Sequence, residues 1–84
     1  MYTVFSKPAC TFCTQAKNLL LLKGLDFKEV HLITGQQQEQ GSEYITREDL
    51  LAKVPTAKSM PQIFLDSVLI GGFKELKESL DAAQ

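Results

Sequence analysis

Blocks of apolar residues, separated by polar segments with proline or glycine, mark out short strands and amphipathic helices along the chain. Short runs of large or β-branched side chains predict strands, and apolar residues that recur every three or four positions predict helices. The expected strands are Tyr2–Ser6, Phe27–Leu32, Gln62–Leu65 and Val68–Ile70; the expected helices are Thr11–Lys23, a short one from Ser42 or Thr46 to Pro55, and a last one with Phe73, Leu76 and Leu80 on one face.

Local signals set the ends of these elements. Gly24 suits the left-handed residue that stops a helix, and Thr46 with Asp49 resembles a capping pair at a helix start. The glutamine-rich stretch 34–42 is polar and of low complexity, so we expect an exposed loop there. The leucines of the first helix, residues 19–22, are expected to lie in the core.

The order of the elements predicts the fold class. A strand, a helix and a second strand within residues 2–32 imply a right-handed βαβ unit with parallel strands. Asp66 and Ser67 leave room only for a hairpin, so the last two strands are expected to be antiparallel. The result is an α/β fold, βαβ–α–ββα, with a four-stranded mixed sheet and helices on both faces.

Length and charge narrow the function classes. The 84 residues make a single expected domain, 1–84, with 44% hydrophobic residues, an ordinary share for a globular protein. The formal net charge of −1 gives no broad basic surface for nucleic acid. No apolar run is long enough to span a membrane, and no signal peptide is visible, so a cytoplasmic protein is expected.

Cys10 and Cys13 are the only cysteines and stand at the start of the first predicted helix. Unpaired backbone N–H groups and the helix dipole at that end stabilise a thiolate over a thiol. Cys10 is therefore the candidate nucleophile. Cys13 lies one turn further on the same face, close enough to form a disulfide with Cys10.

Two other uses of this cysteine pair fit the sequence less well. A structural disulfide is disfavoured, because so small a ring removes little entropy from the unfolded chain. A zinc site needs four ligands, and His31, which we expect to be a sheet residue without a chemical role, is the only histidine. We therefore expect redox chemistry and no bound metal.

Four landmarks in order make the chain resemble a glutaredoxin with a thioredoxin-like fold. They are Cys10-Thr11-Phe12-Cys13 after the first strand, Met60-Pro61 before the third, Gln62-Ile63-Phe64 within it, and Ile70-Gly71-Gly72-Phe73 at the last helix. The resemblance covers nearly the whole chain and is weakest over residues 34–59. Its long middle and its Met-Pro and Gly-Gly-Phe sequences are most similar to the small glutaredoxins of bacteriophages.

The resemblance implies a glutathione site around the cysteines. It implies that Lys7 contacts a glutathione carboxylate; by charge alone Lys7 would also favour a nearby thiolate, although a lysine is most often simply solvated. Thr11 and Phe12 fill the motif, where many glutaredoxins have Pro-Tyr. The resemblance also implies a cis Met60–Pro61 bond that turns the Met60 backbone toward the substrate, whereas without it a trans bond would be assumed.

The last helix is implied to hold the γ-glutamyl end of glutathione. Gly71 and Gly72 permit a ligand to approach closely, and the N–H groups of Phe73 and Lys74 form a natural carboxylate site. A plain strand-to-helix turn explains the same residues equally well. Lys74 departs from the family, in which Asp or Thr is frequent and an acidic group can meet the γ-glutamyl ammonium.

The resemblance implies a monomeric, glutathione-dependent disulfide oxidoreductase. Glutathione is the expected co-substrate, without a tightly bound cofactor, and protein disulfides such as that of ribonucleotide reductase are the expected partners, in the host cytoplasm if a phage encodes the chain. Two alternatives remain open. Lys74 motivates a donor fed by thioredoxin reductase, and some glutaredoxins instead carry an iron–sulfur cluster between two Cys10-type thiolates and glutathione.

Overall fold

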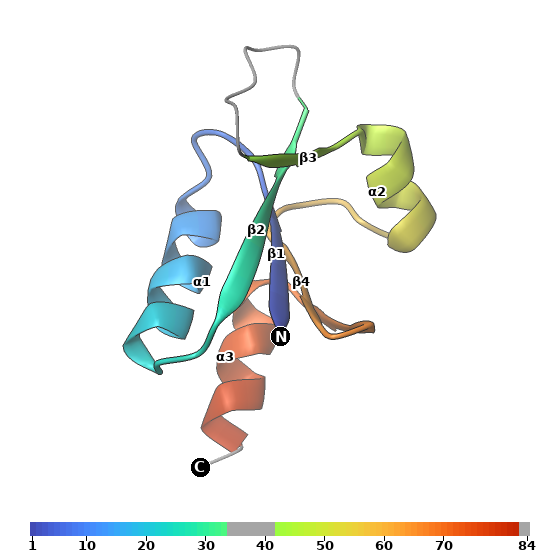
Figure 1. Ribbon diagram of the computed structural model, residues 1–84. Helices are drawn as coiled ribbons and strands as arrows, with labels where there is room; N and C mark the ends of the chain where they lie inside the picture. The colour runs from blue at the N-terminus through green and yellow to red at the C-terminus, as the bar shows by residue number, and fades with distance from the viewer. Residues whose placement is uncertain (34–41, 83–84) are drawn as a thin grey trace.

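The computed structural model describes residues 1–33 and 42–82, which form one five-stranded sheet and three helices (Figure 1). The strands run in the order β3-β2-β1-β4-β5 across the sheet. The elements are β1 Tyr2–Ser6, α1 Thr11–Leu22, β2 Phe27–Leu32, β3 Glu43–Ile45, α2 Arg47–Lys53, β4 Gln62–Leu65, β5 Val68–Gly71 and α3 Phe73–Ala82. The predicted loop over 34–42 lies almost wholly outside the described residues.

The strand pairing confirms the predicted βαβ unit and hairpin. β1 pairs with β2 in parallel, with Tyr2 opposite Phe27, and with β4 in antiparallel. β4 and β5 are antiparallel, and their connection is the two-residue turn Asp66-Ser67, in which Asp66 has a φ of +55°. β1 is therefore the central strand, and the chain that leaves its end leads directly to the cysteines.

The sheet has five strands rather than the expected four. The additional strand, β3, pairs in parallel with β2, and the Ile45 carbonyl accepts a 2.9 Å hydrogen bond from Ile33 N–H. A three-residue strand at a sheet edge is too short to show alternation, so only its pairing with β2 defines it. The helix then begins after Thr46, whose Oγ1 accepts a 3.0 Å hydrogen bond from Asp49 N–H, as predicted.

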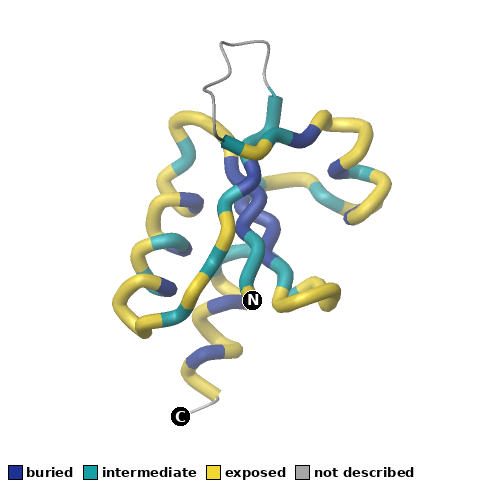
Figure 2. The backbone as a smooth tube through the Cα atoms, in the orientation of Figure 1, coloured by how far each residue is buried: buried dark blue, intermediate teal, exposed yellow. Residues whose placement is uncertain are grey.

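Two groups of buried side chains pack on the two faces of the sheet. The buried positions lie along the central strands and at intervals along the helices (Figure 2). Because side chains alternate along β1, Val4 faces α1 and α3, whereas Phe5 faces α2. The α1/α3 side contains Val4, Ala16, Leu20, Ile63, Leu76 and Leu80, and the α2 side contains Phe5, Val30, Ile45 and Leu50. Helices thus cover both faces, as predicted, with α1 and α3 together on one side (Figure 1).

The predicted role of the α1 leucines is wrong for two of them. Leu20 is fully buried, but Leu21 and Leu22 are 64% and 85% exposed. The apolar stretch is wider than the stripe of the helix that faces the sheet, so its last residues point to solvent. Gly24 ends the segment with a φ of +69°, as expected. No helix in the described part of the chain is long and apolar enough to cross a membrane.

Candidate active site

Cys10 occupies the N-cap of α1, where the helix leaves backbone N–H groups without partners. Its φ and ψ of −111° and 106° are extended, and its Sγ accepts a 3.2 Å hydrogen bond from Cys13 N–H. The first turn of α1 has no acidic side chain to oppose a negative charge. The local electrostatics therefore favour a thiolate at Cys10 in the reduced protein.

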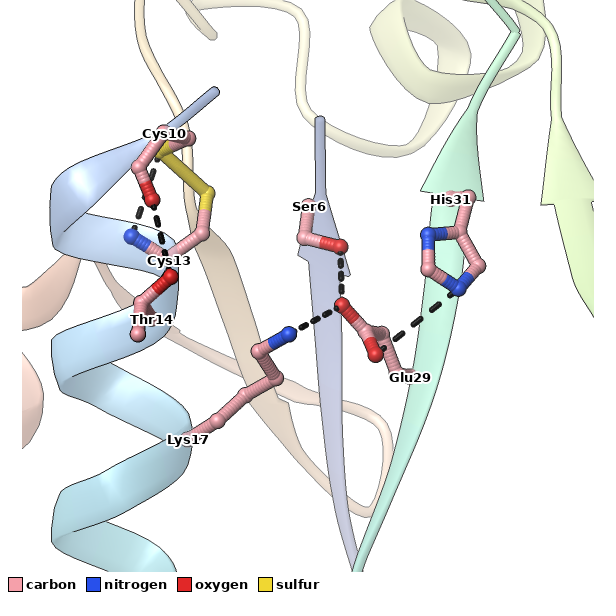
Figure 3. Close-up of polar contacts among 7 residues, drawn as sticks. All are labelled: Ser6, Cys10, Cys13, Thr14, Lys17, Glu29 and His31. Carbon is pink, nitrogen blue, oxygen red and sulfur yellow. Dashed lines mark hydrogen bonds and ion pairs between the residues drawn. A yellow bond between two sulfur atoms is a disulfide. The ribbon is translucent and has the colours of Figure 1, made fainter. Parts of the chain in front are cut away.

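Cys10 and Cys13 form a disulfide, with their Cα atoms 5.2 Å apart (Figure 3). The predicted closeness of the two residues is therefore confirmed. Their access to solvent differs, because Cys13 is only 2% exposed whereas Cys10 is half-buried. An incoming thiol or disulfide can reach Cys10 but not Cys13.

The Met60–Pro61 peptide bond is cis, as the resemblance implied. Pro61 is buried at the start of β4, and Gln62 Nε2 donates a 2.7 Å hydrogen bond to the Ser59 carbonyl, which ties the loop together. The carbonyl oxygen of Met60 lies 3.7 Å from Cys10 Sγ. The Met60 backbone thus borders the accessible sulfur, where an extended peptide could pair with it.

Two aromatic rings link the starts of α1 and α3. Phe12 is 58% exposed and stacks on Phe73, with ring centroids 6.1 Å apart and an interplanar angle of 28°. This stack brings the start of α3 beside the cysteines. Thr11 is exposed at the first position of α1, and Lys74 is exposed in the first turn of α3.

Glu75 is a site residue that the sequence analysis missed. Its Oε1 accepts a 2.8 Å hydrogen bond from Gly72 N–H, the reach-back of a third-position glutamate to a helix N-cap. A Cβ on Gly71, whose φ is +127°, would lie 2.8 Å from Glu75 Cγ. The glycine pair therefore makes room for the Glu75 side chain. The signal was the Gly-x-x-Glu spacing from Gly72.

Lys7 lines a cavity of about 160 Å³ together with Met60 and two further cations, Arg47 and Lys58. The remaining lining residues are Leu32, Leu50, Leu51, Ala57 and Ser59. None of these three cations has an ion-pair partner within residues 1–33 and 42–82. Arg47 and Lys58 were missed because α2 and the loop before β4 are far from Lys7 in sequence.

Neither a metal centre nor the larger cavity competes with this location. No group of three or more His, Cys, Asp or Glu side chains among the described residues could hold a metal ion. A cavity of about 440 Å³ opens on the α2 side of the sheet, but its lining includes neither cysteine nor Met60. The smaller cavity is lined by Met60, whose carbonyl oxygen lies 3.7 Å from Cys10 Sγ, and this residue links the cavity to the disulfide.

A polar cluster lies one turn of α1 beyond Cys13 (Figure 3). Lys17 Nζ donates to Glu29 Oε2 at 2.8 Å, and the buried Ser6 hydroxyl donates to the same oxygen at 2.6 Å. His31 Nε2 lies 3.7 Å from Glu29 Oε1. Burial alone would raise the pKa of Glu29, but the hydrogen bonds from Lys17 and Ser6 and the nearby positive charges lower it below its usual 4.5.

Comparison with known proteins agrees with this geometry. The glutaredoxin family model matches residues 2–70. The chain belongs to the glutaredoxin family. The matched range includes the Cys10–Cys13 pair of this glutaredoxin.

Two curated relatives and one solved structure illustrate the match. This glutaredoxin is 39% identical over 71 residues to a glutaredoxin of Haemophilus influenzae, covering 82% of this chain and 77% of the relative. It is 36% identical over 69 residues to the mitochondrial Glutaredoxin-2 of Bos taurus, again covering 82% of this chain but only 40% of the relative. The chain thus spans about two fifths of the bovine protein.

The solved structure is the reduced glutaredoxin of Escherichia coli. It superposes with a TM-score of 0.66 at 31% identity, covering 95% of this chain and 96% of that one. The expected thioredoxin-like fold is therefore confirmed, with one more strand than expected. A special likeness to bacteriophage glutaredoxins stays a prediction.

The lowered pKa of Glu29 leads to a testable pH dependence of stability. A carboxyl group whose pKa is lower in the folded than in the unfolded state stabilises the fold above its unfolded value, and this contribution is lost as the pH falls through the folded value. We expect the free-energy advantage of wild type over Glu29→Gln in urea unfolding to shrink below about pH 4.5. Glu43→Gln, which breaks the exposed Lys28–Glu43 pair, is the matched control and should show no such trend.

Proposed function

We propose that this chain is a glutathione-dependent oxidoreductase that reduces protein disulfides and glutathione mixed disulfides through Cys10 and Cys13. The observation that carries the proposal is the unequal access of the two sulfurs. Cys10 borders the solvent, whereas Cys13 is sealed beneath it. Only Cys10 can meet a substrate, and only Cys13 is in position to attack Cys10 afterwards.

The proposed reaction has two exchange steps. The Cys10 thiolate attacks one sulfur of the substrate disulfide, and the other sulfur leaves as a thiolate that takes up a proton. Cys13 then loses its proton and attacks Cys10 Sγ, which releases the second substrate thiol and leaves the Cys10–Cys13 disulfide. Two molecules of glutathione restore the dithiol and leave as glutathione disulfide, so electrons balance over the cycle.

Three parts of the site suit three parts of glutathione. The glycyl carboxylate matches the cations Lys7, Arg47 and Lys58, and the cysteinyl unit matches the Met60 backbone beside Cys10. The γ-glutamyl carboxylate matches the N–H groups at the start of α3, and its ammonium matches the Glu75 carboxylate. Glu75 thus offers the acidic group that Lys74 does not, which favours glutathione over thioredoxin reductase as the source of electrons.

Further parts of the proposal rest on resemblance alone. Ribonucleotide reductase is proposed as a protein substrate, and a monomer in the cytoplasm as the working form. A coupled assay with glutathione and glutathione reductase, run against one with thioredoxin reductase, tests the reductant. Turnover only with thioredoxin reductase would contradict the glutathione proposal.

The division of labour between the cysteines can be separated by serine substitutions. Cys10→Ser should abolish all reductase activity, because the exposed nucleophile is lost. Cys13→Ser should keep the reduction of a glutathionylated peptide, which needs Cys10 alone, and lose reduction of a protein disulfide. Steady-state rates with each substrate are the measurement, and Thr14→Ser at the next helical position is the control. Activity retained by Cys10→Ser would show that the roles are assigned wrongly.

The cations that line the smaller cavity, Lys7, Arg47 and Lys58, should contribute to glutathione affinity. Arg47→Gln and Lys58→Gln should each raise KM for glutathione by about two- to fivefold, the effect of one partly exposed charge contact, with kcat little changed. Lys23→Gln removes the same charge at the far end of α1 and should leave KM unchanged. Equal KM values for all three variants would exclude this cavity as the carboxylate site.

A further inference from the structure

The chemistry above leaves the buried Cys13 with a physical difficulty. Its thiol must become a thiolate before it can attack Cys10, yet Cys13 is only 2% exposed. Removal from water disfavours the charged form of any side chain. Charges fixed inside the protein near Cys13 therefore decide how readily that thiol ionises.

One ion pair lies between α1 and the sheet, one helical turn beyond Cys13. Lys17 follows Cys13 by four residues, so the two side chains are neighbours on the sheet-facing side of the helix. Figure 3 shows Lys17 reaching from that turn across to Glu29 on β2, which holds its Nζ at 2.8 Å. The ammonium favours a thiolate at Cys13, and the carboxylate opposes it.

The other groups around this location change the balance little. On β1, the Ser6 hydroxyl is neutral and donates its hydrogen bond to Glu29 Oε2. On β2, His31 lies beyond Glu29, 3.7 Å from Oε1. The buried residues that α3 brings to this side of the sheet are Leu76 and Leu80. The charged residues in the first turn of α3, Lys74 and Glu75, are exposed, as is Lys7 in the loop before Cys10.

The Lys17–Glu29 pair is therefore the partly buried charged feature next to Cys13, with side chains only 29% and 23% exposed.

We propose that Glu29 is a positioning residue for the second exchange step: it fixes the Lys17 ammonium between α1 and the sheet, and the balance of these two charges sets how readily Cys13 loses its proton. The proposal rests on the role proposed above for Cys13. In that step the Cys13 proton passes to solvent, the Cys13–Cys10 bond forms, the bond from Cys10 to the substrate sulfur breaks, and the leaving thiolate takes up a proton.

Glu29 acts here as a fixed charge and not as the proton acceptor. Its lowered pKa means that it stays a carboxylate at neutral pH and is a poor base. Its two nearest partners also occupy the oxygen that faces them, since Lys17 and Ser6 both donate to Oε2.

Neutralising the two members of the pair should have opposite effects. Glu29→Gln keeps a side-chain oxygen that can accept a hydrogen bond from Lys17 but leaves the ammonium uncompensated, which favours the Cys13 thiolate. Lys17→Gln leaves the Glu29 carboxylate uncompensated, which disfavours it. One unit charge at about 8–10 Å inside a protein changes such an ionisation by about tenfold. Because a more acidic thiol is a weaker nucleophile, the rate should change by only about threefold.

A chromogenic aryl disulfide separates the two steps. Mixed in equal amount with the reduced protein in a stopped-flow instrument, it releases a first coloured thiol when Cys10 attacks it and a second when Cys13 closes the disulfide. We expect the second phase at neutral pH to be about threefold faster in Glu29→Gln and threefold slower in Lys17→Gln. The midpoint of its pH profile should move down by about one unit in the first variant and up in the second.

The double variant Lys17→Gln/Glu29→Gln removes both charges and should return the second phase toward the wild-type rate. Glu43→Gln, in the exposed Lys28–Glu43 pair on the outer strands, should leave it unchanged. If both single variants slow the second phase, or the double variant is slower than either, the cluster is merely structural and the proposal is overturned.

The failure of the proposed function would look different. A Cys13→Ser protein that still shows the second phase would remove Cys13 from the reaction, whatever the charge variants do. A second phase that disappears in Cys13→Ser but does not respond oppositely to Glu29→Gln and Lys17→Gln would leave the function standing and overturn this inference.

Discussion

The sulfur of Cys10 accepts a hydrogen bond from the backbone of Cys13 at the first turn of α1, and the site depends on this contact. A helix N-terminus presents N–H groups and a partial positive charge, which a thiolate satisfies better than a neutral thiol. The same turn places Cys13 directly behind Cys10, with their Cα atoms 5.2 Å apart. The first turn of α1 thus suits Cys10 to act as a charged nucleophile, and it places the sulfur of Cys13 where it could displace a substrate sulfur from Cys10.

The sheet places the first turn of α1 next to the other segments of the site. β1 is the central strand, and the short loop that follows its last residue, Ser6, leads to Cys10. Buried Pro61 immediately precedes the neighbouring strand β4, and the carbonyl of Met60 before it lies 3.7 Å from Cys10 Sγ. The second antiparallel step, to β5, delivers the start of α3 beside Phe12. Three segments that are distant in sequence therefore meet around one sulfur.

Local patterns in the sequence were enough for most of the fold and for the cysteines. Apolar periodicity located α1, β1, β2 and the hairpin, and the capping residue Thr46 located α2. Apolar periodicity could not reveal β3, because three residues are too few to show a period. Only the pairing of β3 with β2 defines it as a strand. Leu21 and Leu22 were wrongly expected in the core, because composition does not say which side of a helix the sheet covers.

The missed site residues are those whose roles depend on tertiary contacts. Arg47 and Lys58 join Lys7 only because α2 and the loop before β4 fold to the same cavity. Glu29 is a charged residue within a predicted strand, which makes it unusual there. Nothing in the sequence shows that it contacts Lys17 and Ser6. Glu75 was recoverable from its spacing to Gly72, which is that of a third-position glutamate and a helix N-cap.

Whether Cys10 is the accessible thiolate can be tested by alkylating the fully reduced protein with iodoacetamide across a range of pH, with peptide mapping to assign the modified cysteine. We expect that Cys10 alone reacts, and that its rate stays high well below about pH 8.5, where an ordinary cysteine loses its thiolate. Reaction at Cys13 first, or at Cys10 only with the pH profile of a free cysteine, would show that the helix start does not hold Cys10 as a thiolate.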